Sequence, residues 1–146
     1  MVFGKNCMLS GAHIFINGDN CHLVFGNNVH LNASKYQSTH INVFGNNRRI
    51  IFGNDCLISN NVEIHTTDYH KIYDMDRNRI NGDKDNIIGN NVWIGLGVTI
   101  LKGLIIPDGT IIGAKTLVAG IISKKNTIIV GNPARVIKEN VSWSEL

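Results

Sequence analysis

The sequence predicts an all-β solenoid, a parallel β-helix in which each turn of the chain contributes three short strands. Two observations support this fold class. Stepping by six residues from position 88 to position 118 meets only β-branched aliphatic side chains, and a small residue follows most of them. The aliphatic row is Ile88, Ile94, Ile100, Ile106, Ile112 and Val118, and the small residues are Gly89, Gly95, Gly113 and Ala119. A period of six is neither helical nor strictly alternating, so it indicates a repeat architecture.

Each six-residue unit is interpreted as one strand followed by one tight corner. Three units then close a triangular coil, so that residues one full coil apart lie above one another. The expected stacked pairs are Ile88 with Ile106, Ile94 with Ile112, and Ile100 with Val118. Because neighbouring strands lie about 4.8 Å apart, such columns fill a narrow core with little loss of rotamer freedom.

The first half of the chain repeats this pattern less regularly. An aromatic anchor precedes a Gly- and Asn-containing segment at Phe3, Phe25, Phe44 and Phe52. Asn shares with Gly some tolerance of the left-handed backbone region, so each segment predicts a corner. Phe44 and Phe52 are eight residues apart and not six, which predicts a bulged corner near Arg48 and Arg49. Residues 10–43 are expected to form coils with irregular corners.

The aliphatic row is interrupted once, after Ile64. If the coils continued without a break, the next three core positions would be His70, Asp76 and Gly82. Polar groups are costly in an apolar core, so residues 66–86 are predicted to leave the prism as a polar loop. Long loops within a compact fold are usually functional.

The composition is consistent with one domain spanning residues 1–146, in which residues 136–146 cap the open prism end. The formal net charge of +3 suits small anionic ligands, but no dense basic cluster is interleaved with aromatic residues, so nucleic acid is not an expected partner. No apolar run approaches membrane-spanning length, and a cytoplasmic protein that is not inserted in a membrane is expected. The three cysteines, Cys7, Cys21 and Cys56, are expected to be reduced and buried.

Several short segments in and after the predicted loop resemble a known family. The matching segments are Thr67-Asp68-x-His70-x-Ile72-Tyr73, Lys84-Asp85, Ile88-Gly89-Asn90 and Val92-Trp93. They are similar to segments of the hexapeptide-repeat acyltransferases, most closely of the bacterial capsule and O-antigen polysaccharide O-acetyltransferases, including the polysialic acid type. The resemblance covers roughly residues 50–143.

This resemblance implies a left-handed coil, acetyl-CoA as the donor, a carbohydrate acceptor, no metal, and a homotrimer with active sites between subunits. It implies that His70 is the general base, because the acceptor hydroxyl must lose its proton as it attacks and imidazole ordinarily titrates near pH ~6.5. Trp93 resembles the family tryptophan that shapes the acceptor and pantetheine site. Since no Ser or Cys adjoins His70 in the motif, direct attack on the thioester is expected.

Further site residues follow from the same resemblance. Asp68 is a candidate for orienting the imidazole, although a backbone carbonyl would serve equally well. Tyr73 and Asp74 either shape the acceptor pocket or brace the loop. The oxyanion is expected to be stabilised by a backbone N–H that the sequence does not identify. The predicted cofactor-binding residues are Trp93, Gly95, Gly113, Ala114, Lys115, Arg135 and Lys138, the glycines because small corners let the pantetheine arm approach and Arg135 because guanidinium binds phosphate.

Three alternatives remain open from the sequence. A zinc enzyme of the gamma carbonic anhydrase type would use His30, His65 and His70, although Trp93 and Arg135 have no role in that chemistry. An N-acetyltransferase would act on a nucleotide-linked amino sugar instead of a hydroxyl. In a non-catalytic scaffold the loop would bind a partner. Outside the zinc alternative, the four N-terminal histidines are expected to be surface residues: His13, His22, His30 and His40.

Overall fold

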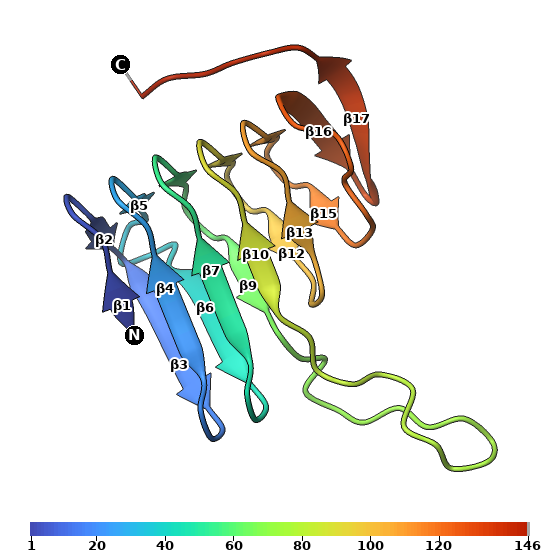
Figure 1. The fold of residues 1–146 in the computed structure, drawn as a ribbon. Coiled ribbons are helices and arrows are strands. Elements are labelled where there is room, and N and C mark those ends of the chain that lie inside the picture. Colours follow the sequence, from blue (N-terminus) through green and yellow to red (C-terminus); the bar gives the residue numbers. More distant parts are fainter. Residues whose placement is uncertain (146) are drawn as a thin grey trace.

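The computed structural model describes residues 1–145, which form three sheets wound into a three-sided prism (Figure 1). Sheet A contains β1 (Val2–Phe3), β4 (His22–Phe25), β7 (Arg49–Phe52), β10 (Asn86–Ile88) and β13 (Ile105–Ile106). Sheet B contains β2 (Met8–Ser10), β5 (His30–Asn32), β8 (Leu57–Ile58), β11 (Trp93–Ile94), β14 (Ile111–Ile112), β16 (Thr127–Gly131) and β17 (Ala134–Glu139). Sheet C contains β3 (Ala12–Asn17), β6 (Thr39–Phe44), β9 (Glu63–His65), β12 (Thr99–Ile100) and β15 (Leu117–Val118).

The predicted stacking of the aliphatic row is confirmed. The pairs Ile88 with Ile106, Ile94 with Ile112, and Ile100 with Val118 all lie in parallel register. Each of these side chains is at most 1% exposed. Burying one such side chain contributes roughly 1.5–3 kcal/mol, so these columns are a main source of the stability of the prism.

The N-terminal coils are longer than the later ones. Equivalent corner residues are 22 positions apart in the first coil and 27 in the second, because β3 and β6 each contain six residues. The corners predicted from the Gly-Asn segments are confirmed, since Asn6, Asn28 and Asn47 all have φ values between 55° and 59°. The irregular corner expected near Arg48 lies between β6 and β7, at residues 45–48.

Two expectations about buried side chains need correction. Phe44 does not join the core row but lies half-buried on the outer face of sheet C, because β6 places Val43 inward instead. Among the cysteines only Cys56 is buried, and burial raises the pKa of its thiol to about 11. Cys7 and Cys21 are half-buried, and all three thiols are free.

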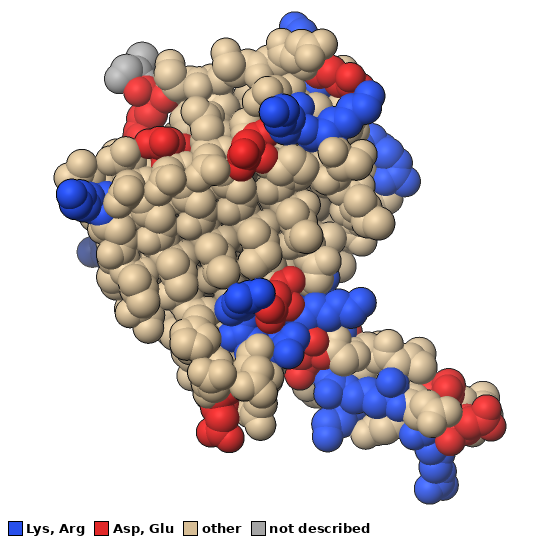
Figure 2. Space-filling model, viewed as in Figure 1, with Lys and Arg blue, Asp and Glu red and all other residues tan. Residues whose placement is uncertain are grey.

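The outer faces of the three sheets differ in polarity. The register aligns one aliphatic outward residue from every strand of sheet A: Val2, Val24, Ile51, Ile87 and Ile105. Sheet B aligns Met8, His30, Leu57, Trp93, Ile111 and Ile128, which are apolar except for His30. The corresponding row of sheet C is His13, His40, Glu63, Thr99 and Leu117. Sheet A faces the viewer in Figure 1, and the same face in Figure 2 carries no charged side chain across its middle.

The chain leaves the prism between β9 and β10, at the corner between sheets C and A. Thr66 and Asn86 are fully buried and mark the two ends of this excursion. Residues 67–85, here called the flap, project away from the prism (Figure 1) and carry many of the charged side chains seen in Figure 2. The predicted polar loop therefore has nearly the expected bounds.

The C-terminal segment covers one strand edge at the prism end, because β17 pairs antiparallel with β16. The chain then runs back along the side of the prism (Figure 1). We call residues 140–145 the strap; Leu146, the last residue of the expected cap, lies outside the described residues. Across residues 1–145, no helix is long and apolar enough to cross a membrane.

Candidate active site

The flap is fixed to the prism by Lys102, the second residue after β12. Its side chain is 12% exposed, and its ammonium group donates to the carboxylate of Asp68 and, at 2.8 Å, to the backbone carbonyl of Asn81. Asp68 lies on the outgoing leg of the flap and Asn81 on the returning leg. The hydrogen bond from Lys102 is the main cause that lowers the pKa of Asp68, so this carboxyl is charged at neutral pH. One buried ammonium therefore joins the two legs.

His70 lies on the outgoing leg with its side chain exposed. Its backbone is held on both sides, because its N–H donates to the Asp68 carbonyl at 2.7 Å and its carbonyl accepts from the Asn81 amide at 2.7 Å. The candidate hydrogen bond from the imidazole to the Asp68 carboxylate is not formed. Lys102 and Asn81 bind that carboxylate instead, so Asp68 does not orient the His70 ring directly.

His65, at the end of β9, is the better-buried histidine of the pair. Its Nδ1 lies 2.9 Å from the Tyr69 hydroxyl and 3.0 Å from the Asn42 amide nitrogen, while its Nε2 lies 3.3 Å from Glu63 Oε2. A neutral imidazole with its proton on Nε2 suits these contacts: the Tyr69 hydroxyl and the Asn42 amide share the one lone pair of Nδ1, and Nε2 faces Glu63. Burial is the main cause that raises the pKa of Tyr69, so its hydroxyl stays protonated and can donate.

A pocket opens beside this network, on the outer face of sheet C at the root of the flap. Its volume is about 300 Å³, and it is lined by Phe15, His40, Asn42, Phe44, Glu63, His65 and Tyr69. The lining combines aromatic rings with hydrogen-bonding side chains. This combination suits a sugar ring, whose faces are apolar and whose edges carry hydroxyl groups.

The titration of His65 predicts how stability depends on pH. Burial lowers the pKa of His65, with His40 acting in the same direction and Glu63 opposing it. In the unfolded chain this imidazole regains its ordinary pKa of about 6.5, so the unfolded state binds the proton first as the pH falls. The free energy of unfolding should therefore be unaffected by this group above pH ~6.5 and should decrease as the pH falls below that value.

Thermal unfolding of the wild type and of His65→Gln between pH ~8 and pH ~5 would measure this effect. Any stability advantage of the wild type should shrink as the pH falls, because only its side chain titrates. The other titratable groups that face this position, His40, Glu63 and Tyr69, are present in both proteins. Parallel curves for the two proteins would contradict the prediction.

The remaining contacts of the flap are internal or lie at its root. Asp83 accepts hydrogen bonds from Thr67 Oγ1 at 2.8 Å and from Arg79 at 3.0 Å, and Asp85 pairs with Arg49 at 2.9 Å. At the tip, Asp74 accepts from the backbone N–H groups of residues 76 and 78, and the latter is the main cause that lowers its pKa. The Asp74 carboxylate therefore braces the tip rather than facing the pocket.

Trp93 lies on the outer face of sheet B and is 39% exposed. Trp143 of the strap packs against it with ring centroids 5.9 Å apart, and the Trp143 indole N–H donates to the Asn91 carbonyl at 2.8 Å. The strap therefore covers part of the surface that includes Trp93.

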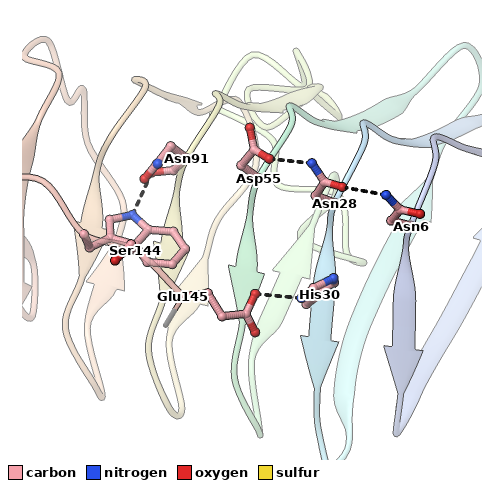
Figure 3. Close-up of a pocket in the computed structure, with 8 residues that line it drawn as sticks. Asn6, Asn28, His30, Asp55, Asn91, Ser144 and Glu145 are labelled. Carbon is pink, nitrogen blue, oxygen red and sulfur yellow. Dashed lines mark hydrogen bonds and ion pairs between the residues drawn. The ribbon is translucent and has the colours of Figure 1, made fainter.

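A second pocket, of about 490 Å³, lies beneath the strap (Figure 3). Its polar side chains satisfy one another. Figure 3 shows Asn28 between Asn6 and Asp55, at 3.2 Å and 2.7 Å, and Glu145 bound to His30 at 2.7 Å. These contacts stabilise neighbouring coils and hold the strap in place.

Several of the predicted cofactor-binding residues form one column at the corner between sheets B and C. The Gly95 N–H donates to the carbonyl of Ile112, the residue before Gly113. A Cβ on Gly113 would in turn meet the side chain of Val130. Val130 pairs with Arg135 across the β16–β17 hairpin. Ala114 and Lys115 continue this corner, and Lys115 has φ of 60°. Lys138 lies apart from the column, because it pairs with Ile128 two residues earlier in β16.

One chain does not bring His70 and Trp93 together. The flap leaves from the corner between sheets C and A, whereas Trp93 lies on sheet B, the face opposite that corner. The histidines of the zinc alternative are also separated, since His30 lies on sheet B and pairs with Glu145 while His65 lies on sheet C. Within residues 1–145, no group of three or more His, Cys, Asp or Glu side chains is placed to hold a metal ion.

Three residues of this region were not predicted from the sequence: Lys102, Asn81 and Tyr69. The signal for Tyr69 was its position between Asp68 and His70 in the motif. Lys102 is a single cation two residues after Ile100 of the regular row, and this position was a signal in the sequence. Nothing in the sequence indicates that Asn81 contacts the His70 carbonyl, because that contact depends on how the two legs of the flap lie.

Comparison with known proteins identifies the family. No family model matches the chain. A polysialic acid O-acetyltransferase of Neisseria meningitidis is 35% identical over 156 residues, which cover 96% of this chain and 73% of that protein. A galactoside O-acetyltransferase of Escherichia coli strain K12 is 31% identical over 115 residues, which cover 79% of this chain and 56% of that protein.

Solved structures agree with this likeness. The polysialic acid-specific acetyltransferase NeuO superposes with a TM-score of 0.68 at 25% identity, covering 99% of this chain and 89% of that one. The polysialic acid O-acetyltransferase OatWY gives a TM-score of 0.65 at 26% identity, covering 99% and 88%. The fold is thus the left-handed parallel β-helix that the resemblance implied. The chain belongs to the hexapeptide-repeat acyltransferases, in the group that includes the polysialic acid O-acetyltransferases, and it is an acyltransferase.

Proposed function

We propose that this protein transfers an acetyl group from acetyl-CoA to a hydroxyl of a bacterial surface polysaccharide sugar or of its precursor. The observation that carries the proposal is the position of His70, an exposed imidazole on a flap whose backbone is fixed by Asn81 and by the Lys102 anchor. Relatives that act on polysialic acid or on galactosides support a carbohydrate acceptor. Since acetyl-CoA is a cytoplasmic donor, a cytoplasmic enzyme is part of the proposal.

In the proposed mechanism, His70 takes the proton of the acceptor hydroxyl as the oxygen attacks the thioester carbonyl. The tetrahedral intermediate then collapses with cleavage of the carbon–sulfur bond. The imidazolium returns its proton to the departing thiolate, so that acetylated sugar and free CoA leave and His70 is neutral again. A backbone N–H would stabilise the oxyanion, and no covalent acyl-enzyme is required.

The pocket on sheet C is the proposed place of the acceptor. It adjoins Tyr69, the residue before His70, so a sugar held there would lie beside the base. The flap tip residue Tyr73 is exposed and belongs to the same leg as His70, which leaves it free to contact a longer acceptor. Asp74 is assigned to bracing the tip.

The donor is proposed to lie along the column that contains Gly95, Gly113 and Arg135. The missing side chains at the glycines let neighbouring coils pack closely, because a Cβ at Gly95 or Gly113 would lie 2.7 Å or 2.6 Å from an atom of the next coil. The smooth corner that results is the surface along which the pantetheine arm is proposed to run. Arg135 is exposed at the end of the column, where its guanidinium would bind the nucleotide phosphates. Lys115 lies beside the column and Lys138 is a more distant candidate.

The homotrimer is part of the proposal because it would bring the separated halves of the site together. In a ring with threefold symmetry each interface joins two different patches. Sheets A and B present aligned apolar rows, whereas sheet C is polar. Packing sheet A of one copy on sheet B of the next would place the flap beside the neighbour's Trp93 and Gly95. The flap tip also exposes Ile72, Tyr73, Met75 and Ile80, which would become buried against that neighbour.

A thiol-release assay with acetyl-CoA over a panel of acceptors tests the proposed function. The panel should contain polysialic acid, neutral surface polysaccharides and nucleotide-linked amino sugars. We expect CoA release that depends on a saccharide and a product that mild base hydrolyses, as an ester does and an amide does not. A base-stable product would indicate N-acetylation, and carbon dioxide hydration without acetyl transfer would favour the zinc alternative.

A further inference from the structure

The turn that presents His70 has an unfavourable backbone conformation. The hydrogen bond from His70 N–H to the Asp68 carbonyl, at 2.7 Å, spans only two residues, and Tyr69 at its centre has φ of 63°. This is a γ-turn with positive φ at the central residue, a form that is rare and strained. An aromatic residue gains nothing locally from this conformation, so the surrounding structure must enforce it.

The side chain of Tyr69 supplies that enforcement. Its hydroxyl lies 2.9 Å from His65 Nδ1, and its ring packs edge-on against Phe44 and His65, with centroids 5.4 Å and 5.5 Å away. His65 is itself fixed by Asn42 and Glu63, and all of these partners belong to the rigid strands of sheet C. The central residue of the strained turn is therefore attached to sheet C through its side chain.

We propose that Tyr69 is a positioning residue for His70, which acts by holding the γ-turn through its contact with His65. The inference rests on the proposed function, in which His70 is the general base. Rotation of the Tyr69 backbone to an ordinary conformation would break the His70 N–H to Asp68 hydrogen bond and would turn the imidazole away from its present direction. Because proton transfer requires hydrogen-bond reach of the acceptor hydroxyl, a misdirected imidazole would lower kcat.

The two other anchors of the flap do not perform this task. Lys102 holds the Asp68 carboxylate and the Asn81 carbonyl, and Asn81 holds the His70 carbonyl. These contacts fix the residues on either side of the turn, but they leave the φ angle of Tyr69 unspecified. The Tyr69 N–H also donates to Thr67 Oγ1 at 3.1 Å, but that bond lies within the flap. Among the contacts of residues 1–145, the Tyr69 side chain is what connects the central residue of the turn to sheet C.

Three variants of Tyr69 separate positioning from simple packing. Tyr69→Phe keeps the ring and removes the hydrogen bond, so kcat should fall about two- to tenfold. Tyr69→Ala and Tyr69→Gly both remove the side chain, but only glycine adopts positive φ without a penalty. Positioning therefore predicts that the glycine variant exceeds the alanine variant in kcat by about five- to thirtyfold. A packing role alone predicts equal kcat for these two variants, because neither has the ring, and differences confined to the unfolding temperature.

The measurements are steady-state kinetics with acetyl-CoA and an active saccharide, together with thermal unfolding of each variant. We expect the losses to appear in kcat, with the KM for acetyl-CoA unchanged, since the Tyr69 side chain contacts Phe44 and His65 of sheet C and is not proposed to bind the donor. A further readout does not depend on activity. Exchange of the His70 amide proton, followed by NMR, should accelerate in Tyr69→Phe, because the hydrogen bond from the His70 N–H to the Asp68 carbonyl opens more often.

The outcomes distinguish this inference from the proposed function. If the variants follow the predicted order and His70 amide exchange accelerates, the inference is supported. An alanine variant as active as the glycine variant, or a change confined to KM or to unfolding temperature, would overturn it while leaving the role of His70 intact. If the wild type shows no acetyl transfer, the proposed function fails, and unchanged amide exchange in Tyr69→Phe would still overturn the positional role of Tyr69.

Discussion

Replacement of His70 by alanine is expected to lower kcat for acetyl transfer by about 10²- to 10⁴-fold, the usual contribution of a positioned general base. The flap should keep its conformation, because Asn81 and Asp68 bind the backbone of residue 70 and not its side chain. The KM for acetyl-CoA should change little, since His70 is proposed to act on the acceptor hydroxyl and not to bind the donor. Steady-state thiol release with a saturating saccharide measures both constants.

His13→Ala is the matched control for this variant. His13 is also exposed, but it lies on β3, where its ring stacks on that of His40 at a centroid distance of 5.2 Å. We expect wild-type kcat from His13→Ala. If His70→Ala retained more than about a tenth of the wild-type kcat, the proton would have to go elsewhere, and His65 would become the next candidate.

Mixed trimers are expected to recover activity from two inactive variants, His70→Ala and Trp93→Ala. The reason is geometric, because the flap of one copy and Trp93 of the same copy lie on different sides of the prism. In a trimer that contains both variants, one interface can combine an intact flap with an intact Trp93 from the neighbour. Each mixed trimer should contain one complete site out of three, which is about one quarter of all sites after random mixing at equal amounts and before purification.

The experiment requires both variants to carry different affinity tags, so that only mixed trimers are purified. A mixture of His70→Ala with the His70→Ala/Trp93→Ala double variant is the control and should stay inactive, since no interface regains an intact His70. Verified mixed trimers without recovered activity would contradict the proposed site between subunits. A separate variant tests which surfaces meet. Ile51→Asp, on sheet A, should prevent assembly if sheet A packs on sheet B of the neighbour.

The regular half of the fold could be predicted because β11 to β15 are each only two residues long. With strand and corner both fixed in length, the inward position recurs every six residues, and the row from Ile88 to Val118 shows this directly. The first half could not be phased in this way. There β3 and β6 are extended to six residues, and the coil length changes from 22 to 27 residues.

Only the parts of the candidate site that depend on local sequence motifs could be predicted. The sequence indicated His70 and the ends of the flap, because both follow from a short motif and from an interrupted row. The anchor of the flap joins Lys102 to Asp68, 34 residues away, and the strap joins Glu145 to His30, 115 residues away. Such pairs depend on which surfaces the folded chain brings together, and neither charge nor spacing in the sequence specifies them. The role assigned to Asp68 was wrong for the same reason.

The strap has one consequence for spectroscopy. The chain contains two tryptophans, and both belong to the contact between Trp93 and Trp143, at a centroid distance of 5.9 Å. Intrinsic indole emission from this protein therefore originates at a single spot on sheet B. Any molecule that settles there, or any displacement of the strap, would alter that emission without an attached dye.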